Sequence, residues 1–169
     1  MIATGWQLAQ INIARFKAPI DAPLLAGFVE MLDPINALAD VAPGFVWRLQ
    51  TDEGNATSIH AFDDDLILVN MSVWESIEDL DAFVYRSPHF DVFRRRREWT
   101  EHMERAYVAL WWIPAGMIPT VEEGKRRLDL LIGSGPTPEA FTFKRTYPPP
   151  EAASAEPGTG AESGSHVAR

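Results

Sequence analysis

NMSVWESIEDLDAFVYRSPHF (residues 70–90) and YVALWWIP (residues 107–114) are the two stretches that decide the fold of this chain. The first predicts the end of an apolar strand that stops at Trp74, then a helix that begins after Ser76 and a second helix that begins after Ser87. The second predicts another strand, which carries adjacent tryptophans. This order of strand, helices and strand indicates a sheet covered by helices.

The strand over residues 67–74 has one apolar face and one partly polar face. Successive side chains of a strand point to opposite faces, so Asn70, Ser72 and Trp74 share one face, while the other carries only Met71 and aliphatic residues. An amide, a hydroxyl and an indole on one face are typical of a pocket wall. We therefore expect the helices to cover the apolar face and to leave the polar face as the wall of a pocket.

Composition and charge restrict the classes of function. The chain has 169 residues, of which 46% are hydrophobic, enough for one apolar core. It has no cysteine, so disulfides, thiolate metal sites and cysteine nucleophiles are excluded. A net charge of −9 opposes binding to nucleic acids or anionic membranes, and no apolar stretch is long enough to span a bilayer. We expect a cytoplasmic protein that binds neither nucleic acid nor membrane.

Composition changes sharply after Thr146. From Tyr147 onward the chain is rich in Pro, Ala, Gly, Ser and Glu, and such a segment buries too little apolar surface to offset the entropy lost on ordering. We predict a folded domain over residues 1–146 and a disordered tail over residues 147–169.

The other predicted elements follow from alternation, helical spacing and capping residues. They are a strand over residues 6–14, a helix from Asp21 to Leu38 that Asp33–Pro34 kinks or splits, a strand over 45–50 that returns through 57–62 as a hairpin, a helix from Thr120 to Ile132 and a closing strand over 141–143. Alternation places Asn12 on the less apolar face of the first strand and Arg48 on the less apolar face of the second.

This order of elements predicts an α+β fold on the ferredoxin-like plan, an antiparallel sheet with helices on one face. Such a sheet leaves its other face bare. Two subunits commonly bring their bare faces together, so we expect a homodimer, a dimeric α+β barrel whose facing sheets enclose a chamber.

Several segments resemble a known family. The pattern is LAQINIAR (residues 8–15), APGFVWRLQ (42–50), NMSVWES (70–76), FVYRSPHFDVFRRRREW (83–99), LWWIPAG-x-x-PT (110–120) and GPTPEAFTF (135–143). This pattern is similar to the DUF3291 family of bacterial proteins, and the central run resembles the dimeric α+β barrel superfamily that contains antibiotic biosynthesis monooxygenases. Met117 stands where that family often has a histidine.

The resemblance implies an activity as well as a fold. Cofactor-free aromatic oxygenases of that superfamily pair an asparagine with a tryptophan four residues later on one strand, and Asn70 and Trp74 have that spacing and face. Such an enzyme deprotonates a phenolic substrate, stabilises the anion and holds oxygen in a dry chamber.

On this hypothesis Asn70 and Asn12 hydrogen-bond the oxyanion, Arg48 stabilises it electrostatically, Trp74 stacks on the aromatic substrate and His89 accepts the proton. We expect these five residues to converge on one chamber. Further candidates for its substrate-binding wall are Ser72, Trp47, Trp111 and Trp112.

Each assignment has a structural alternative. Tryptophans often pack in a core or a dimer interface, and a histidine in the first turn of a helix is often solvent-facing. The arginines of residues 94–97 cover a full helical turn, so most of them should be solvated and balanced by nearby glutamates. The three aspartates of residues 63–65 splay apart, which favours a polar loop over a metal site.

Three classes of function therefore stay open. The first is a cofactor-independent oxygenase or isomerase that acts on a small aromatic or enolisable substrate. The second is a haem protein with His89 or His102 as axial ligand, although the histidine of haem-degrading relatives would fall near Phe93. The third is a non-catalytic protein that stores or senses a small ligand.

Overall fold

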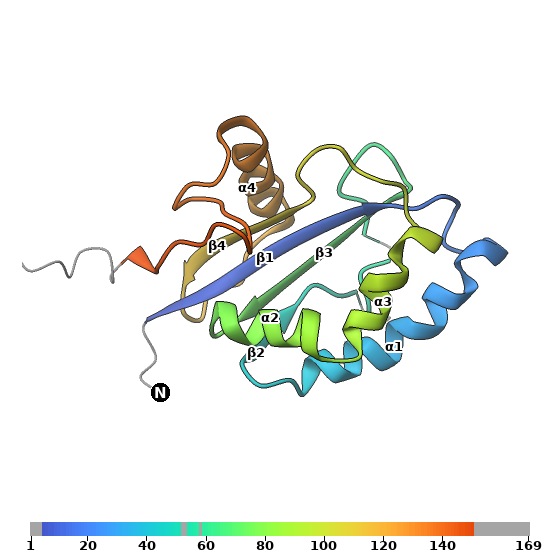
Figure 1. The fold of residues 1–169 in the computed structure, drawn as a ribbon, viewed down its shortest axis with the longest axis horizontal. Coiled ribbons are helices and arrows are strands. Elements are labelled where there is room, and N and C mark those ends of the chain that lie inside the picture. Colours follow the sequence, from blue (N-terminus) through green and yellow to red (C-terminus); the bar gives the residue numbers. More distant parts are fainter. Residues whose placement is uncertain (1–4, 52–53, 58, 151–169) are drawn as a thin grey trace, which may run out of the picture.

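The sheet and its connections follow the ferredoxin-like plan. The computed structural model describes residues 5–51, 54–57 and 59–150. In chain order its elements are β1 (Trp6–Arg15), η1 (Pro23–Leu25), α1 (Ala26–Asp40), β2 (Phe45–Arg48), β3 (Ile67–Trp74), α2 (Ile77–Arg86), α3 (His89–Arg95), η2 (Arg96–Glu98), β4 (Val108–Pro114) and α4 (Val121–Ser134). The strands form one antiparallel sheet in the order β2-β3-β1-β4 (Figure 1). The predicted α+β, ferredoxin-like fold is confirmed.

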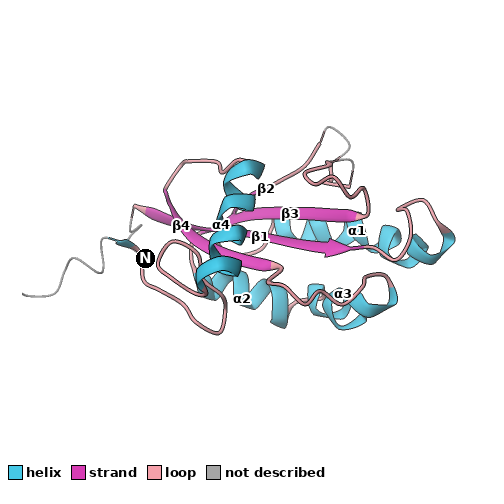
Figure 2. Ribbon diagram, turned by 90° about the horizontal axis from the view of Figure 1, so that it is seen from above, coloured by secondary structure: helices cyan, strands magenta, loops and turns pink. Residues whose placement is uncertain are grey.

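Helices cover both faces of this sheet. α1, α2 and α3 lie on one side, whereas α4 lies across the strands on the other side (Figure 2). The expectation that helices lie on one face therefore holds for α1 to α3 only. The sheet is the middle layer of three.

The apolar face of the sheet is the one that packs under α4. It contributes fully buried side chains to a core with α4, among them Ala9, Ile11, Val69, Met71, Val73 and Trp111. Gly124 lets α4 approach closely, because a Cβ atom added there would lie 2.9 Å from Ile11 Cδ1 and 3.0 Å from Met71 Cε. This face is therefore buried within one chain, without a second subunit.

The partly polar face lies under α1, α2 and α3, which is the reverse of the prediction. Leu8 and Trp74 on this face pack with Leu80 and Phe83 of α2 in a second apolar cluster. The strand alternation was predicted correctly, since Val69, Met71 and Val73 lie opposite to Asn70, Ser72 and Trp74. The side that the helices would cover was predicted wrongly.

Predicted capping residues begin two of the helices. The Ser76 hydroxyl accepts a hydrogen bond from the backbone N–H of Asp79 at 3.1 Å, and the Thr120 hydroxyl accepts one from Glu123 at 3.1 Å. Each bond satisfies a backbone donor that the first helical turn leaves free. At α3 the Ser87 hydroxyl accepts from the backbone N–H of His89 at 3.2 Å, while Pro88 holds the N-cap position.

Other boundaries differ from the prediction. β2 ends at Arg48, no strand forms at the described residues of 57–62, and 141–143 contributes only an isolated bridge between Phe141 and Leu110. α1 continues through Pro34 without splitting. Tyr147, predicted to begin the tail, packs on Phe141, and its carbonyl accepts a hydrogen bond from Trp112. The rest of the predicted tail, residues 151–169, lies outside the described residues.

Candidate functional site

A cavity of about 390 Å³ lies between the partly polar face of the sheet and helices α1, α2 and α3. It is lined mainly by apolar and aromatic side chains from both layers. The predicted catalytic residues Asn12, Arg48, Asn70, Trp74 and His89 all line it, and so does Ser72. The structure thus brings them together, but inside one chain. The predicted chamber between two facing sheets is wrong, because α1 to α3 cover this face.

Side-chain amides form a ladder across β1 and β3. The strand register sets Asn12 opposite Asn70 and Gln10 opposite Ser72. Gln10 Nε2 donates to Asn70 Oδ1 and to Ser72 Oγ, each at 2.8 Å, and Asn12 Nδ2 donates to Gln10 Oε1 at 3.1 Å. Trp74 Nε1 extends the ladder by donating to Ser72 Oγ at 2.8 Å. The ladder fixes the rotamers of these side chains, because each is held by its neighbours.

The ladder leaves two polar atoms for a ligand. Asn12 Nδ2 also donates to Asn70 Oδ1 at 3.3 Å, so the amino group of Asn12 and the carbonyl group of Asn70 are both hydrogen-bonded within the ladder. Within the described part of the chain, Asn70 Nδ2 and Asn12 Oδ1 have no hydrogen-bond partner. Asn70 can therefore donate to a bound oxyanion, and Asn12 can accept from a hydroxyl.

His89 lies on the α3 side of the same cavity. Its Nδ1 lies 3.4 Å from the carbonyl oxygen of Val84, and because a carbonyl oxygen only accepts, the tautomer that makes this hydrogen bond has its proton on Nδ1 and its lone pair on Nε2. Its ring packs on Phe83 with centroids 5.1 Å apart, and Phe83 in turn stacks on Trp74 at 5.2 Å. Burial lowers the pKa of His89, with the Val84 carbonyl acting in the opposite direction. The imidazole is thus held neutral, as a proton acceptor requires.

Arg48 lines the cavity with its charge already paired. Its Nε donates to Asp40 Oδ1 at 2.7 Å, its Nη2 to Asp40 Oδ2 at 3.3 Å, and its Nη1 to the Gly54 carbonyl at 2.7 Å. This bidentate pair joins the end of α1 to β2. The arrangement favours a structural role for Arg48 over stabilisation of a substrate anion.

The tryptophans named from the sequence separate into two groups. Trp74 lines the cavity but is only 1% exposed, with one ring face against Phe83 and its N–H used by Ser72. Trp47, Trp111 and Trp112 do not line it. Trp47 and Trp111 pack in the core under α4, and Trp112 packs on Phe141. We therefore assign these three to packing.

The polar residues that line the cavity include four that were not predicted as site residues and that matter below: Gln10, Tyr85, Arg96 and Tyr107. Gln10 could have been found, because alternation places it on the same face as Asn12. The other three come from α2, η2 and the segment before β4, and only the tertiary fold brings them to the cavity. Met117, at the family's frequent histidine position, is 58% exposed and lies outside the cavity.

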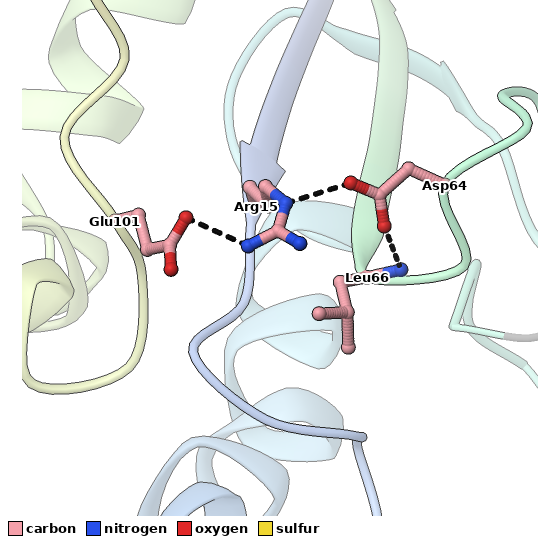
Figure 3. Close-up of polar contacts among 4 residues, drawn as sticks. All are labelled: Arg15, Asp64, Leu66 and Glu101. Carbon is pink, nitrogen blue, oxygen red and sulfur yellow. Dashed lines mark hydrogen bonds and ion pairs between the residues drawn. The ribbon is translucent and has the colours of Figure 1, made fainter.

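Arg15 anchors one end of the cavity wall. At the end of β1 its Nε pairs with Asp64 Oδ2 at 2.6 Å and its Nη1 with Glu101 Oε2 at 2.7 Å (Figure 3). The Asp64 carboxylate also accepts a hydrogen bond from the backbone N–H of Leu66 at 2.9 Å, and these bonds lower the pKa of Asp64. The link holds the segment around Glu101, which lines the cavity, against β1.

The candidate site contains no group of metal ligands in the described residues. No set of three histidine, aspartate or glutamate side chains there could hold a metal ion. Asp64, from the acidic run of residues 63–65, forms a salt bridge with Arg15. Among the described helices, none is long and apolar enough to cross a membrane.

Two solved structures from Nitrosomonas europaea share part of this architecture. One is a protein of unknown function, with 12% sequence identity, a TM-score of 0.43 and coverage of 69% of this chain and 97% of its own. The other is a candidate antibiotic biosynthesis monooxygenase, with 17% identity, a TM-score of 0.44 and coverage of 71% of this chain and 99% of its own. Similarity at this level carries no argument about activity.

The sequence itself gives a stronger assignment. No curated protein matches the chain. A model of the family described as "Domain of unknown function (DUF3291)" matches residues 7–157, which is most of the chain and includes every candidate site residue. The resemblance predicted from the sequence motifs is confirmed, and the chain belongs to the DUF3291 family.

Proposed function

We propose that this protein is a cofactor-independent enzyme of the monooxygenase or isomerase type, which acts on a small aromatic or enolisable substrate. One observation carries the proposal. His89 offers a neutral imidazole with its Nε2 lone pair, and Asn70 offers an amide N–H that has no hydrogen-bond partner in the described residues. Both side chains line the same largely apolar cavity. A base and an oxyanion donor are the groups that enolisation needs.

The first chemical step is removal of a proton by His89. Nε2 accepts the acidic proton of a phenol, or of the carbon next to a carbonyl, and the electron pair of the broken bond moves onto the substrate oxygen. Asn70 Nδ2–H donates a hydrogen bond to that oxygen, where the negative charge develops. The amide ladder holds Asn70 in place while this happens, so little reorganisation is needed.

Two outcomes follow from the same anion. In an oxygenase the anion transfers electrons to O₂, and one oxygen atom remains on a substrate carbon as a carbonyl. The other leaves as water, with the proton taken by His89 and the hydrogen that remained on that carbon. In an isomerase the proton returns from His89 to a different carbon. The proposed roles of Asn70 and His89 are common to both outcomes.

Haem, the alternative cofactor, does not fit these residues. The cavity volume of about 390 Å³ lies near the lower end of the range for small-ligand sites, whereas a tetrapyrrole needs a broad planar slot. The absorption spectrum of the purified protein in the Soret region tests directly whether it carries haem.

The homodimer predicted from the sequence plays no part in the proposed chemistry. The two residues given chemical roles here, His89 and Asn70, lie in the same chain. Pairing with a second copy remains a prediction.

The proposal is tested by proton exchange. The probe is 2-tetralone, a small aromatic ketone with acidic C–H groups, incubated with the protein in D₂O without oxygen and followed by NMR. We expect exchange above the uncatalysed rate. His89→Gln should slow the catalysed exchange about 100-fold, and Asn70→Ala about 10- to 100-fold, because they remove the base and the oxyanion donor.

A matched control separates catalysis from folding. His60 is exposed and outside the cavity, so His60→Gln should exchange 2-tetralone at the wild-type rate. Exchange by wild type that His89→Gln leaves unchanged would overturn the assignment of the base. No acceleration with 2-tetralone or with phenolic probes would overturn the enzymatic proposal and favour a ligand-binding protein.

A further inference from the structure

One part of the cavity carries positive charge that no carboxylate balances. Arg96 and Arg97 both line it. Their neighbours in the sequence are paired, because Arg94 bonds Asp91 at 3.1 Å and Arg95 bonds Glu98 at 3.0 Å. Throughout the described residues, no carboxylate lies within salt-bridge distance of Arg96 or Arg97. This contrasts with Arg48, which Asp40 neutralises.

Arg96 is held so that much of its guanidinium stays available. Its Nη1 donates to the Phe93 carbonyl at 2.8 Å, and its Cζ lies 4.1 Å from the centroid of the Phe93 ring. These contacts fix the side chain and leave N–H groups for a ligand. Glu101, a carboxylate that also lines the cavity, is already paired with Arg15.

Tyrosine hydroxyls lie in the same part of the cavity. Tyr85 and Tyr107 line it and are each 39% exposed. The ring of Tyr85 packs edge-on against Phe93 at 5.8 Å and Phe143 at 5.7 Å, which orients its hydroxyl. The pKa of Tyr85 is raised chiefly by burial and also by Asp81 and Tyr107, while the charge of Arg96 lowers it, so the two hydroxyls and the guanidinium lie within each other's field.

This cationic part lies beside the amide ladder. Tyr107 directly precedes Val108, and Val108 pairs with Asn12 in the sheet register. A ligand can therefore place an anionic group near Arg96 and its reacting oxygen near Asn70. The chain as a whole has a charge of −9 and repels anions. An unpaired arginine in the cavity would therefore be needed to attract an anionic ligand to it.

We propose that the cavity selects an aromatic or enolisable carboxylic acid, whose carboxylate pairs with Arg96 and accepts hydrogen bonds from Tyr85 and Tyr107. This inference rests on the proposed function only in using the same cavity. Arginine matches a carboxylate in two-point geometry, and such charge-assisted bonds are about twice as strong as neutral ones.

The test compares a carboxylate with its neutral isostere. The probes are 6-hydroxy-2-naphthoate and 6-hydroxy-2-naphthamide, titrated into the full chain while tryptophan fluorescence is measured. We expect the carboxylate to bind about tenfold or more tightly than the amide, with a preference that falls as salt rises. Arg96→Gln should abolish this preference, and Arg96→Lys should keep part of it.

The control for charge is Arg94→Gln. This variant removes one positive charge from the same arginine run, but Arg94 pairs with Asp91 and does not line the cavity, so the preference should persist. Circular dichroism melts of each variant verify folding.

The outcomes distinguish this inference from the proposed function. Equal binding of the two probes to wild type, or a preference that Arg96→Gln and Arg96→Lys both leave intact, overturns the carboxylate site alone. A preference lost in Arg96→Gln together with proton exchange unaffected by His89→Gln supports the carboxylate site and overturns the catalytic proposal. Failure of both probes to bind overturns the carboxylate site and removes support for an aromatic substrate.

Discussion

Burial of the His89 imidazole couples its charge to stability and to activity. Its folded pKa lies below the unfolded value of 6.5, chiefly through loss of solvation. Between the two pKa values the unfolded chain binds more protons, so stability rises with pH. The contribution of the neutral His89 side chain to the unfolding free energy is complete above pH 6.5 and is lost as pH falls through the folded pKa.

This dependence can be measured by urea unfolding at about pH 5 and about pH 7. We expect the fall in unfolding free energy at the lower pH to be smaller in His89→Gln than in wild type. His60→Gln should behave like wild type, since His60 is exposed. Equal pH dependence in wild type and His89→Gln would show that His89 does not lose solvation on folding.

Period-two alternation accounts for most of what the sequence could predict about the cavity. Asn12, Asn70 and Trp74 were placed on one face because side-chain direction is a local property of a strand. The pairing of Arg48 with Asp40 could not be predicted, because it depends on the end of α1 reaching β2. Arg96 and Tyr107 were missed for the same reason.

A glycine at the start of β2 sets how closely α2 approaches the sheet. Gly44 has φ of 78°, and a Cβ atom added to it would lie 2.0 Å from Asp79 Oδ2 in α2. Gly44→Ala should therefore combine backbone strain with a collision and cost about 3 kcal/mol of unfolding free energy.

Gly116→Ala provides a matched comparison for this substitution. Gly116 has a similar φ of 87°, but nothing lies within 4 Å of the added Cβ, so only the strain of about 1 kcal/mol should appear. Denaturant unfolding of both variants gives the difference. Similar losses would show that α2 yields easily and that Gly44 serves the turn alone.

The bulge in β2 shows why alternation failed at one element. Between Phe45 and Trp47 the register shifts, so Phe45 pairs with Trp74 while Trp47 pairs with Val73. Simple alternation predicted Phe45 and Trp47 on one face, whereas Phe45 lines the cavity and Trp47 packs under α4. One extra residue in a strand moves the side chains of the preceding residues to the opposite face of the sheet, and no signal in the sequence marks the extra residue.

The three-layer architecture changes the expectation for assembly. Helices of the same chain cover both faces of the sheet, α1 to α3 on the partly polar face and α4 on the apolar face, so each chain carries its own core. We expect the thermal midpoint of unfolding to be independent of protein concentration, because a fold that requires its dimer becomes more stable as concentration rises.

Calorimetric melts at two concentrations about 100-fold apart, together with light scattering, would check this expectation. A midpoint that rises with concentration would support the homodimer predicted from the sequence. The ferredoxin-like order of elements was predictable because capping residues and strand patterns are local. The side of the sheet that each helix covers was not, since it depends on how the connections cross the sheet.

The alternation of core and cavity residues along β1 limits which mutations this strand can accept. The strand lies between β3 and β4, and its odd-numbered residues from Ala9 to Ile13 build the core under α4, while Gln10 and Asn12 build the cavity. An insertion or deletion of one residue would exchange the two sets and place amides in the apolar core. Point substitutions at alternate positions can therefore change ligand preference, whereas a change in the length of this strand would disrupt the core and the cavity together.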